Sequence, residues 1–395
     1  MTRSRVHDIV IFGASGFTGE LVAHYFARHV SLDRTPWALA GRNREKLLAL
    51  RERLAKVHPA CARLPIVVAS TDDRASLVAL AKNAKVVLTT VGPFARHGEP
   101  LFQACAEHGT DYVDSCGEFS FVRKMRAAYD TRARESGAIM VSCCGVDSIP
   151  TDLGLFFTMQ QLAQQSGSAE LGAVEVEGLF EVRARPSGGT WNSILSVMGE
   201  LPASPSRTEP PAAPSGRTVA RVDGRVHRDR EFGWVVPFPS VDPEIALQSA
   251  AALPQYGSAF SYAHYLVMRT LSRMTMLGVG LGSVAAVAQL SLGRKLLGRA
   301  LPSGQGPSEQ ERARSWFKLR FRAKHAGGTL CTEVRGGDPG YDETAKMLAE
   351  SALCLAVDRA RLPARCGVLT PACAFGDVLL RRLTRAGLVF EVVSR

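Results

Sequence analysis

The chain has 395 residues, of which 46% are hydrophobic and 22% are charged. This is the composition of a globular protein of two or three domains, and it excludes a disordered chain, a collagen-like repeat and a small secreted scaffold. Nine cysteines occur without a CxxC pair, and this odd count without a pairing framework predicts a reducing compartment. The N-terminal segment contains only a four-residue apolar run, too short for a signal peptide, so we expect a cytoplasmic protein.

The net charge of +11 is concentrated in residues 264–324, which hold eleven Lys or Arg and two acidic residues. Inside this segment, residues 274–293 form a run of twenty residues without a formal charge. Glycines and polar residues dilute the apolar side chains of this run, so we interpret it first as a buried or pocket-lining helix. The alternatives are a membrane span and a helix lying on the inner face of a membrane, which would make residues 264–324 a peripheral membrane contact. The segment has no recognisable nucleic-acid-binding module, so we expect no nucleic-acid partner.

The first 150 residues alternate short apolar runs with amphipathic stretches. The apolar runs predict strands at Asp8–Phe12, Trp37–Ala40, Ile66–Val68, Val86–Thr89, Asp111–Asp114 and Ala138–Val141. The stretches between them predict helices at Gly16–Arg28, Arg44–Val57, Ser70–Ala81, Gly98–Glu107 and Ser120–Ser136. Regular alternation of this kind predicts an α/β fold, with a doubly wound parallel Rossmann sheet in a domain of residues 1–150.

After Pro150 the pattern changes to that of an α+β domain with an antiparallel sheet, which we place at residues 151–340 and expect to bind substrate or lipid. A helix at Asp152–Gln165 precedes a strand at Val174–Arg185, and the Pro- and Ser-rich residues 201–216 are predicted to be a mobile loop. Further on, Trp316–Lys324 and Thr329–Arg335 flank a Gly-Gly pair, which predicts a hairpin. Its first strand alternates apolar with basic residues, so we expect one apolar face and one basic face.

The C-terminal residues 341–395 contain two amphipathic helices, Tyr341–Arg361 and Phe375–Ala386, and a last strand at Val389–Val393. We expect these C-terminal helices to pack back on the Rossmann domain.

A glycine-rich string follows the first strand and opens the first helix: Gly13, Ala14, Ser15, Gly16, Phe17, Thr18 and Gly19. In a dinucleotide-binding domain, the first glycine allows a tight turn, the middle one admits the pyrophosphate, and the last lets the helix pack against the strand. The helix N-terminus adds its positive dipole end. A glycine turn without a ligand is the alternative, but the position of the string after a first parallel strand favours cofactor binding.

The end of the second strand indicates which dinucleotide is bound. An NAD-specific site carries an Asp or Glu here for the ribose 2′-hydroxyl, whereas this chain has Gly41 followed by Arg42, with Arg44 and Lys46 close behind. Cations suit a 2′-phosphate, so the sequence predicts NADPH. The alternative is that these cations are a solvated start of the next helix.

Three further strand ends carry residues of interest. Thr90, Val91, Gly92 and Pro93 follow the fourth strand, where we expect a loop beside the nicotinamide. The fifth and sixth strand ends supply candidates for substrate contact or proton transfer, namely Tyr112, Asp114, Asp147 and Ser148. Asp147 and Ser148 equally suit a cap for the helix that follows. No HExxH motif or metal-spaced His and Cys cluster occurs, so we expect no metal.

These motifs resemble those of the saccharopine dehydrogenase-like oxidoreductases, and most closely those of the trans-acting enoyl reductase group. The resemblance rests on the strings IVIFGASGFTGELVA, ALAGRNREKL, TVGPF, YVDSCGE, CGVDSIPTDLG, GGDPGY and GVLTPACAFGDVLLRRL. It covers nearly the whole chain, with residues 202–230 least matched. Val146 stands where the family usually has phenylalanine, which is a mild departure.

The resemblance implies an NADPH-dependent reductase of lipid metabolism. Its substrate would be the enoyl group of an acyl thioester on an acyl carrier protein or polyketide synthase, reduced in trans during synthesis of complex lipids such as glycolipids. Water or Tyr112 would supply the proton, and the basic face of the hairpin would dock an acidic carrier or, equally well, anionic lipid headgroups. Two alternatives remain, a membrane- or lipid-associated protein with a vestigial dinucleotide fold and a saccharopine-type amino-acid dehydrogenase.

Overall fold

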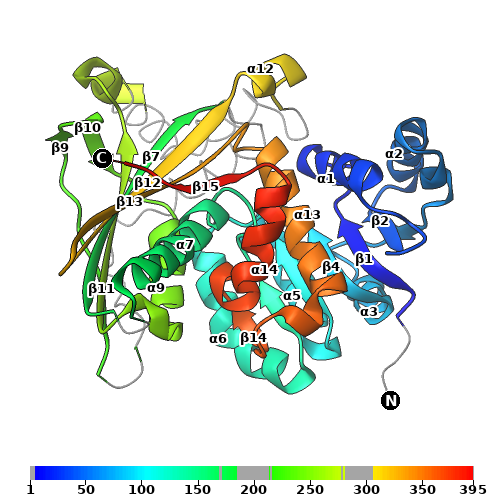
Figure 1. The fold of residues 1–395 in the computed structure, drawn as a ribbon. Coiled ribbons are helices and arrows are strands. Elements are labelled where there is room, and N and C mark those ends of the chain that lie inside the picture. The colour runs from blue at the N-terminus through cyan, green and yellow to red at the C-terminus, as the bar shows by residue number, and fades with distance from the viewer. Residues whose placement is uncertain are drawn as a thin grey trace. The chain divides into compact units, whose positions relative to one another are not determined.

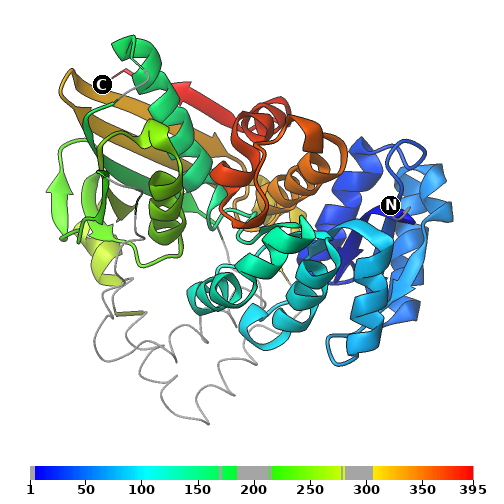
Figure 2. The ribbon, with the colours of Figure 1, turned by 90° about the horizontal axis from the view of Figure 1, so that it is seen from below.

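The computed structural model describes residues 5–168, 171–184, 213, 216–276, 279–280 and 306–394. These form two compact units, one of residues 1–149 with 341–386 and the other of residues 150–340 with 387–395 (Figures 1 and 2). Most of the predicted loop at 201–216 and most of the uncharged run at 274–293 lie outside the described residues. Within the described ranges, no helix combines the length and the apolar character needed to cross a bilayer.

The first unit is built on a seven-stranded parallel sheet with the order β14-β6-β5-β4-β1-β2-β3. Its strands are β1 (His7–Phe12), β2 (Trp37–Gly41), β3 (Ile66–Val68), β4 (Ala84–Thr89), β5 (Asp111–Asp114), β6 (Ile139–Val141) and β14 (Gly367–Leu369). The sequence predicts the first six, because strands buried on both faces are continuous apolar runs. The strand β14 is three residues long and carries no such signal.

Helices cover both faces of this sheet. They are α1 (Phe17–His29), α2 (Arg44–Val57), α3 (Arg74–Asn83), α4 (Phe94–His97), α5 (Glu99–His108), α6 (Phe119–Ser136), α13 (Asp342–Val357) and α14 (Pro371–Arg385), with short 3₁₀ turns at Pro59–Arg63 and Arg359–Arg361. Helix α13 contacts α1, β1, β4 and β5 (Figure 1). Glu350 fixes this arrangement, since its carboxylate accepts from the Tyr25 hydroxyl of α1 at 2.6 Å and from Arg382 Nε of α14 at 2.6 Å.

The second unit is built on an eight-stranded mixed sheet with the path β15-β13-β12-β7-β11-β10-β9, in which β8 also pairs with β11. Its strands are β7 (Ala173–Arg183), β8 (Thr218–Arg221), β9 (His227–Asp229), β10 (Gly233–Pro237), β11 (Ala259–Val267), β12 (Trp316–His325), β13 (Gly328–Gly336) and β15 (Val389–Val392). Its helices are α7 (Ile149–Ser166), α9 (Asp242–Ala252) and α12 (Glu309–Ala313), with a 3₁₀ turn at Pro254–Tyr256. The predicted fold class is confirmed, although β11 runs parallel to β7 and β8, so the sheet is not antiparallel throughout.

The predicted hairpin is confirmed as β12 and β13, which pair antiparallel from Phe317 opposite Gly336 to His325 opposite Gly328. The apolar side of β12 is buried beneath α7, because Gly154 of that helix lies against Phe321. A Cβ at position 154 would come within 2.4 Å of the Phe321 ring. A glycine is therefore needed where the helix meets the sheet.

On the same face of the sheet, Gly178 of β7 makes room for a buried polar pair. The Tyr262 hydroxyl bonds His264 Nδ1 at 2.7 Å, and burial lowers the pKa of His264 to about 3, so the ring is neutral. A Cβ at position 178 would lie 2.2 Å from the Tyr262 oxygen.

We predict that Gly178→Ala destabilises the second unit, because the methyl group overlaps the Tyr262 hydroxyl and overpacking of this kind typically costs about 1–3 kcal/mol. Denaturant unfolding measures the effect. Gly172→Ala is the matched control, since a Cβ there meets nothing within 4 Å. Equal stability of the two variants would contradict the packing argument.

Candidate functional site

The glycine string forms the turn between β1 and α1 at the carboxyl end of the first sheet. Gly13 has a φ of 87°, and a Cβ there would lie 2.7 Å from the Val91 side chain. At Gly19 a Cβ would lie 2.2 Å from the Gly13 carbonyl oxygen, so the helix can pack this close to the strand only with glycine. Both glycines thus have the steric roles that a dinucleotide-binding turn requires.

The N-terminus of α1 has no side-chain cap. Its N-cap residue, Gly16, is exposed and has no side chain that could accept from the backbone N–H groups at the start of this 13-residue helix. The N–H groups at a helix N-terminus and the helix dipole together attract an anion such as pyrophosphate.

The end of β2 lies next to this turn. A Cβ at Gly41 would lie 4.0 Å from the Ser15 hydroxyl oxygen, so the residues after Gly41 flank the glycine string. Arg42, Arg44 and Lys46 are exposed there, and within the described ranges no carboxylate pairs with them. Three cations without acidic partners fit a cofactor that carries a 2′-phosphate.

The turn after β4 lies on the other side of β1. The Thr90 hydroxyl donates to the Gly13 carbonyl at 3.3 Å, which ties this turn to the glycine string. The Gly92-Pro93 peptide is cis, and Gly92 is exposed. In a doubly wound sheet, this position on the far side of the strand-order reversal faces the second half of the dinucleotide.

The predicted residue Asp114 is fully buried and ties two strand ends together. Its Oδ1 accepts from the backbone N–H of Cys116 at 2.9 Å and of Cys143 at 3.0 Å, and its Oδ2 accepts from the Ser142 hydroxyl at 2.9 Å. Cys143 has a φ of 62°, a conformation rare outside glycine. Because both of its oxygens are engaged, the structure supports Asp114 as a residue that holds the loops after β5 and β6, and we do not propose it as a proton donor.

The other three candidates lie in different environments. Tyr112 is fully buried against Phe102, with ring centroids 4.9 Å apart, and burial raises its pKa well above the ordinary value. Ser148 is also fully buried. Asp147 alone is exposed as a residue; its carboxylate lies beside the backbone of Gly117, and the protein atoms that surround the carboxylate raise its pKa to about 6. Asp147 is therefore the candidate that solvent and a ligand can reach.

Three residues that the sequence did not single out complete this edge. Thr344 of α13 accepts from the Val146 backbone N–H at 3.1 Å, and Tyr341 packs edge-on against Phe17 at 5.0 Å. Glu118 accepts from two backbone N–H groups at the start of α4. Their sequence signals are strings that fit the family: Glu118 ends YVDSCGE, Tyr341 ends GGDPGY, and Thr344 opens the string TAKM shortly after it, but none of the three stands in a spacing rule.

The residues present at this edge fit a dinucleotide cofactor. The glycine turn leaves no room for side chains, the N-cap residue of α1 is a glycine, and the cations after Gly41 are unpaired in the described part of the chain. These features define the cofactor-binding domain of a dinucleotide-dependent oxidoreductase.

Comparison with known sequences identifies the family. Residues 9–141 match the model of the saccharopine dehydrogenase NADP-binding domain. The chain is 33% identical to a trans-acting enoyl reductase of Mycobacterium tuberculosis, over 98% of this chain and 97% of that protein. It is 31% identical to the saccharopine dehydrogenase-like oxidoreductase of Mus musculus, over 100% of this chain and 99% of that protein. The chain belongs to this family of saccharopine dehydrogenase-like oxidoreductases and trans-acting enoyl reductases, and NADPH is its cofactor.

Solved structures share the fold at low sequence identity. Apo saccharopine dehydrogenase (L-Glu forming) from Saccharomyces cerevisiae has a TM-score of 0.56 and 11% identity, over 98% of this chain and 100% of that chain. Homospermidine synthase from Legionella pneumophila, in complex with NAD, also has a TM-score of 0.56, with 10% identity over 99% of this chain and 92% of that chain. These similarities show a common architecture of both units.

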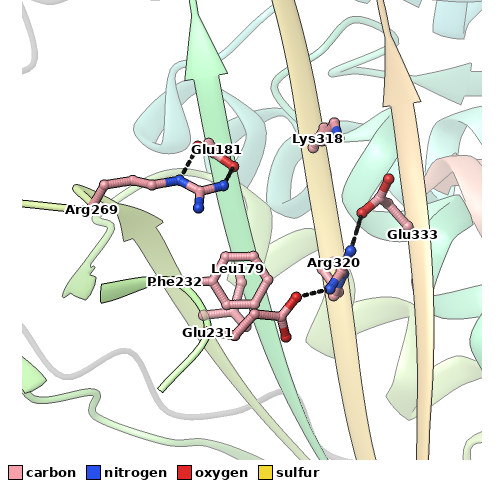
Figure 3. Close-up of a pocket in the computed structure, with 8 residues that line it drawn as sticks. All are labelled: Leu179, Glu181, Glu231, Phe232, Arg269, Lys318, Arg320 and Glu333. Carbon is pink, nitrogen blue, oxygen red and sulfur yellow. Dashed lines mark hydrogen bonds and ion pairs between the residues drawn. The ribbon is translucent and has the colours of Figure 1, made fainter. Parts of the chain in front are cut away.

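The second unit has a small cavity of about 70 Å³ on the face of its sheet opposite α7. It is lined by Leu179, Glu181, Glu231, Phe232, Arg269, Lys318, Arg320 and Glu333 (Figure 3). Arg269 donates to both oxygens of Glu181 at 2.6 Å, and Arg320 pairs with Glu231 and, at 2.8 Å, with Glu333. The charges that line this cavity are thus largely paired with one another.

The hairpin face that the sequence predicts to be basic is neutralised in the same way. Arg322 pairs with Asp229 at 2.9 Å and with Glu177 at 3.3 Å, and Arg320 pairs as described above. The neighbouring strands place carboxylates in register with the basic residues of β12, which a single strand's sequence does not reveal. Lys318 and Lys324 alone of the four have no carboxylate partner in the described ranges, so the expectation of a strongly basic docking face is not supported.

Asp114 gives the protein a specific pH dependence. Burial raises its pKa to about 6, above the ordinary Asp value. At pH values between the ordinary pKa of Asp in the unfolded state and the raised pKa in the native state, the native state holds more protons than the unfolded state. The free energy of unfolding therefore falls as the pH rises through this range. We predict that wild type loses up to about 3 kcal/mol relative to Asp114→Asn between pH 4 and pH 7. Denaturant unfolding across this range measures it, with the exposed-loop variant Asp72→Asn as control; a constant difference between wild type and Asp114→Asn would contradict the prediction.

We predict that Arg42→Asp weakens NADPH binding by about tenfold or more and leaves NADH binding nearly unchanged, because the new carboxylate repels a 2′-phosphate and accepts from a 2′-hydroxyl. Titration followed by cofactor fluorescence measures both affinities. Lys56→Asp, an exposed cation at the far end of α2, is the matched control. An equal loss of affinity for both cofactors would show that Arg42 does not bind the 2′-phosphate.

Proposed function

We propose that the protein reduces the enoyl double bond of acyl thioesters with NADPH, acting in trans on chains held by an acyl carrier protein or polyketide synthase during the synthesis of lipids such as glycolipids. The observation that carries the proposal is the similarity to a trans-acting enoyl reductase over both units of the chain. The cofactor-binding features at the carboxyl edge of the first sheet support an active enzyme over a vestigial fold, because a purely structural protein has no need of unpaired cations after Gly41.

The reaction requires a hydride at the β-carbon of the thioester and a proton at its α-carbon. NADPH, when bound, supplies the hydride. The π electrons of the double bond then become an enolate on the thioester, which must be protonated to give the saturated product. The chain therefore needs to orient the thioester and to admit a proton from solvent.

Asp147 is the residue that we propose to handle this proton. It is exposed at the loop after β6, and the protein atoms packed around its carboxylate raise its pKa to about 6, so a fraction of the carboxyl stays protonated near neutral pH. Tyr112, the donor considered from sequence, is fully buried in the core.

For the carrier, the exposed Lys318 and Lys324 replace the arginines of the hairpin as docking candidates, since the arginines already have carboxylate partners. A charge reversal at Arg320 would place a carboxylate beside Glu231 and Glu333 and would destabilise the sheet. Lys318→Glu and Lys324→Glu test docking without this effect.

The direct test incubates the purified protein with NADPH and an enoyl thioester, presented on an acyl carrier protein and on a pantetheine, and follows NADPH oxidation together with the mass of the product. Saturation of the acyl chain supports the proposal. Oxidation only of saccharopine with NADP⁺ would replace it with the amino-acid dehydrogenase alternative.

We predict that Asp147→Asn lowers kcat for enoyl reduction by about 10²-fold, the usual contribution of a proton-transfer group, and leaves the NADPH dissociation constant unchanged. Wild-type turnover should decrease as the pH rises through about 6, where the donor ionises, and the variant should lose this step. Stopped-flow and steady-state kinetics across pH measure both. Asp33→Asn, an exposed aspartate of the same unit, is the control; an unchanged pH profile in Asp147→Asn would rule out the role.

A further inference from the structure

Glu118 is a buried carboxylate that binds backbone rather than a cation. It is 5% exposed, and it stands at the end of the loop that follows β5. Its two oxygens accept from the N–H groups of Phe94 at 2.8 Å and of Ala95 at 2.9 Å. No Lys or Arg pairs with it in the described part of the chain, so these two bonds are the main stabilisation of its charge.

The two N–H groups belong to the first residues of α4, directly after the Gly92-Pro93 turn. Helix α4 continues almost directly into α5, because Gly98 between them also has a helical conformation, so α5 holds its C-terminal end and the position of its N-terminal end depends on other contacts. Bonds from backbone N–H groups to an ionised acceptor are roughly twice as strong as neutral ones. Glu118 is therefore the main polar contact that fixes where this turn ends.

Apolar contacts hold the same turn from a second direction. The Phe94 ring lies 5.8 Å from the Phe121 ring, and a Cβ at Gly98 would come within 2.7 Å of Phe121. At the start of the turn, Thr90 is bonded to the glycine string. Between these anchors, Gly92 is exposed at the carboxyl edge.

The location of this turn indicates which part of the cofactor it serves. The glycine string receives the pyrophosphate, and the cations after β2 flank the adenosine half. The turn after β4 lies on the opposite side of β1 in the sheet order, where the nicotinamide half of a dinucleotide binds. A displacement of the turn should change contacts with the nicotinamide half and leave those with the adenosine half.

We propose that Glu118 is a positioning residue for the nicotinamide half of NADPH. By binding Phe94 and Ala95, it holds the turn that shapes this half of the cofactor site. The inference concerns cofactor binding and holds whichever substrate is reduced, so it stands or falls independently of the proposed enoyl reduction.

The test compares two ligands in Glu118→Gln. This change preserves size, but the amide group can accept from only one of the two N–H groups and turns its own N–H₂ toward the other. NADPH and 2′,5′-ADP, which carries the adenosine half and its 2′-phosphate without nicotinamide, are titrated by calorimetry. We expect NADPH to bind at least about tenfold more weakly to the variant and 2′,5′-ADP to bind within about twofold of wild type.

Glu135→Gln, an exposed glutamate at the end of α6, is the matched control. If Glu118→Gln does not fold, the same two titrations are made with Glu118→Asp, because this variant keeps the charge and shortens the side chain by one methylene. Equal weakening of both ligands would indicate a general structural role and would overturn the proposal, as would unchanged binding of NADPH.

Discussion

The cofactor edge of the first unit depends on buried carboxylates that accept hydrogen bonds from the backbone of the loops. The carboxyl ends of parallel strands leave backbone groups that the sheet no longer pairs, and buried groups of this kind need partners. Asp114 supplies them for the loops after β5 and β6, and Glu118 supplies them for the turn after β4. The loops that a dinucleotide contacts are thereby fixed before it binds, which lowers the entropy lost on binding.

Contacts along this edge also include α13, a helix about 200 residues further along the chain than the loop after β6. Thr344 holds the loop after β6, Tyr341 packs on Phe17 of the glycine string, and Thr90 connects that string to the turn after β4. The result is a ring of contacts that includes every predicted cofactor loop except the one after β2. This explains why residues 341–386 belong to the first unit, although residues 150–340 of the second unit separate them from it in sequence.

The sequence predicts those parts of the molecule that depend on local pattern. Apolar runs fix β1 to β6, and the order of glycines fixes the turn around Gly13, because both rest on backbone sterics within a few residues. The roles of Glu118 and Thr344 depend on partners in other loops and helices, at α4 and in the loop after β6, which no local spacing encodes. The hairpin shows the same limit: β12 alone is basic, whereas cross-strand register sets Glu177 against Arg322 and cancels the charge.

If the loops of this edge together form the NADPH site, amide hydrogen exchange measured with and without NADPH reveals it. NADPH binding should slow exchange at residues 13–19, 90–95 and 143–147, and the N-terminal turn of α13 should be protected in parallel because the ring of contacts connects these segments. Protection confined to residues 13–19, or none in any of these segments, would contradict this prediction.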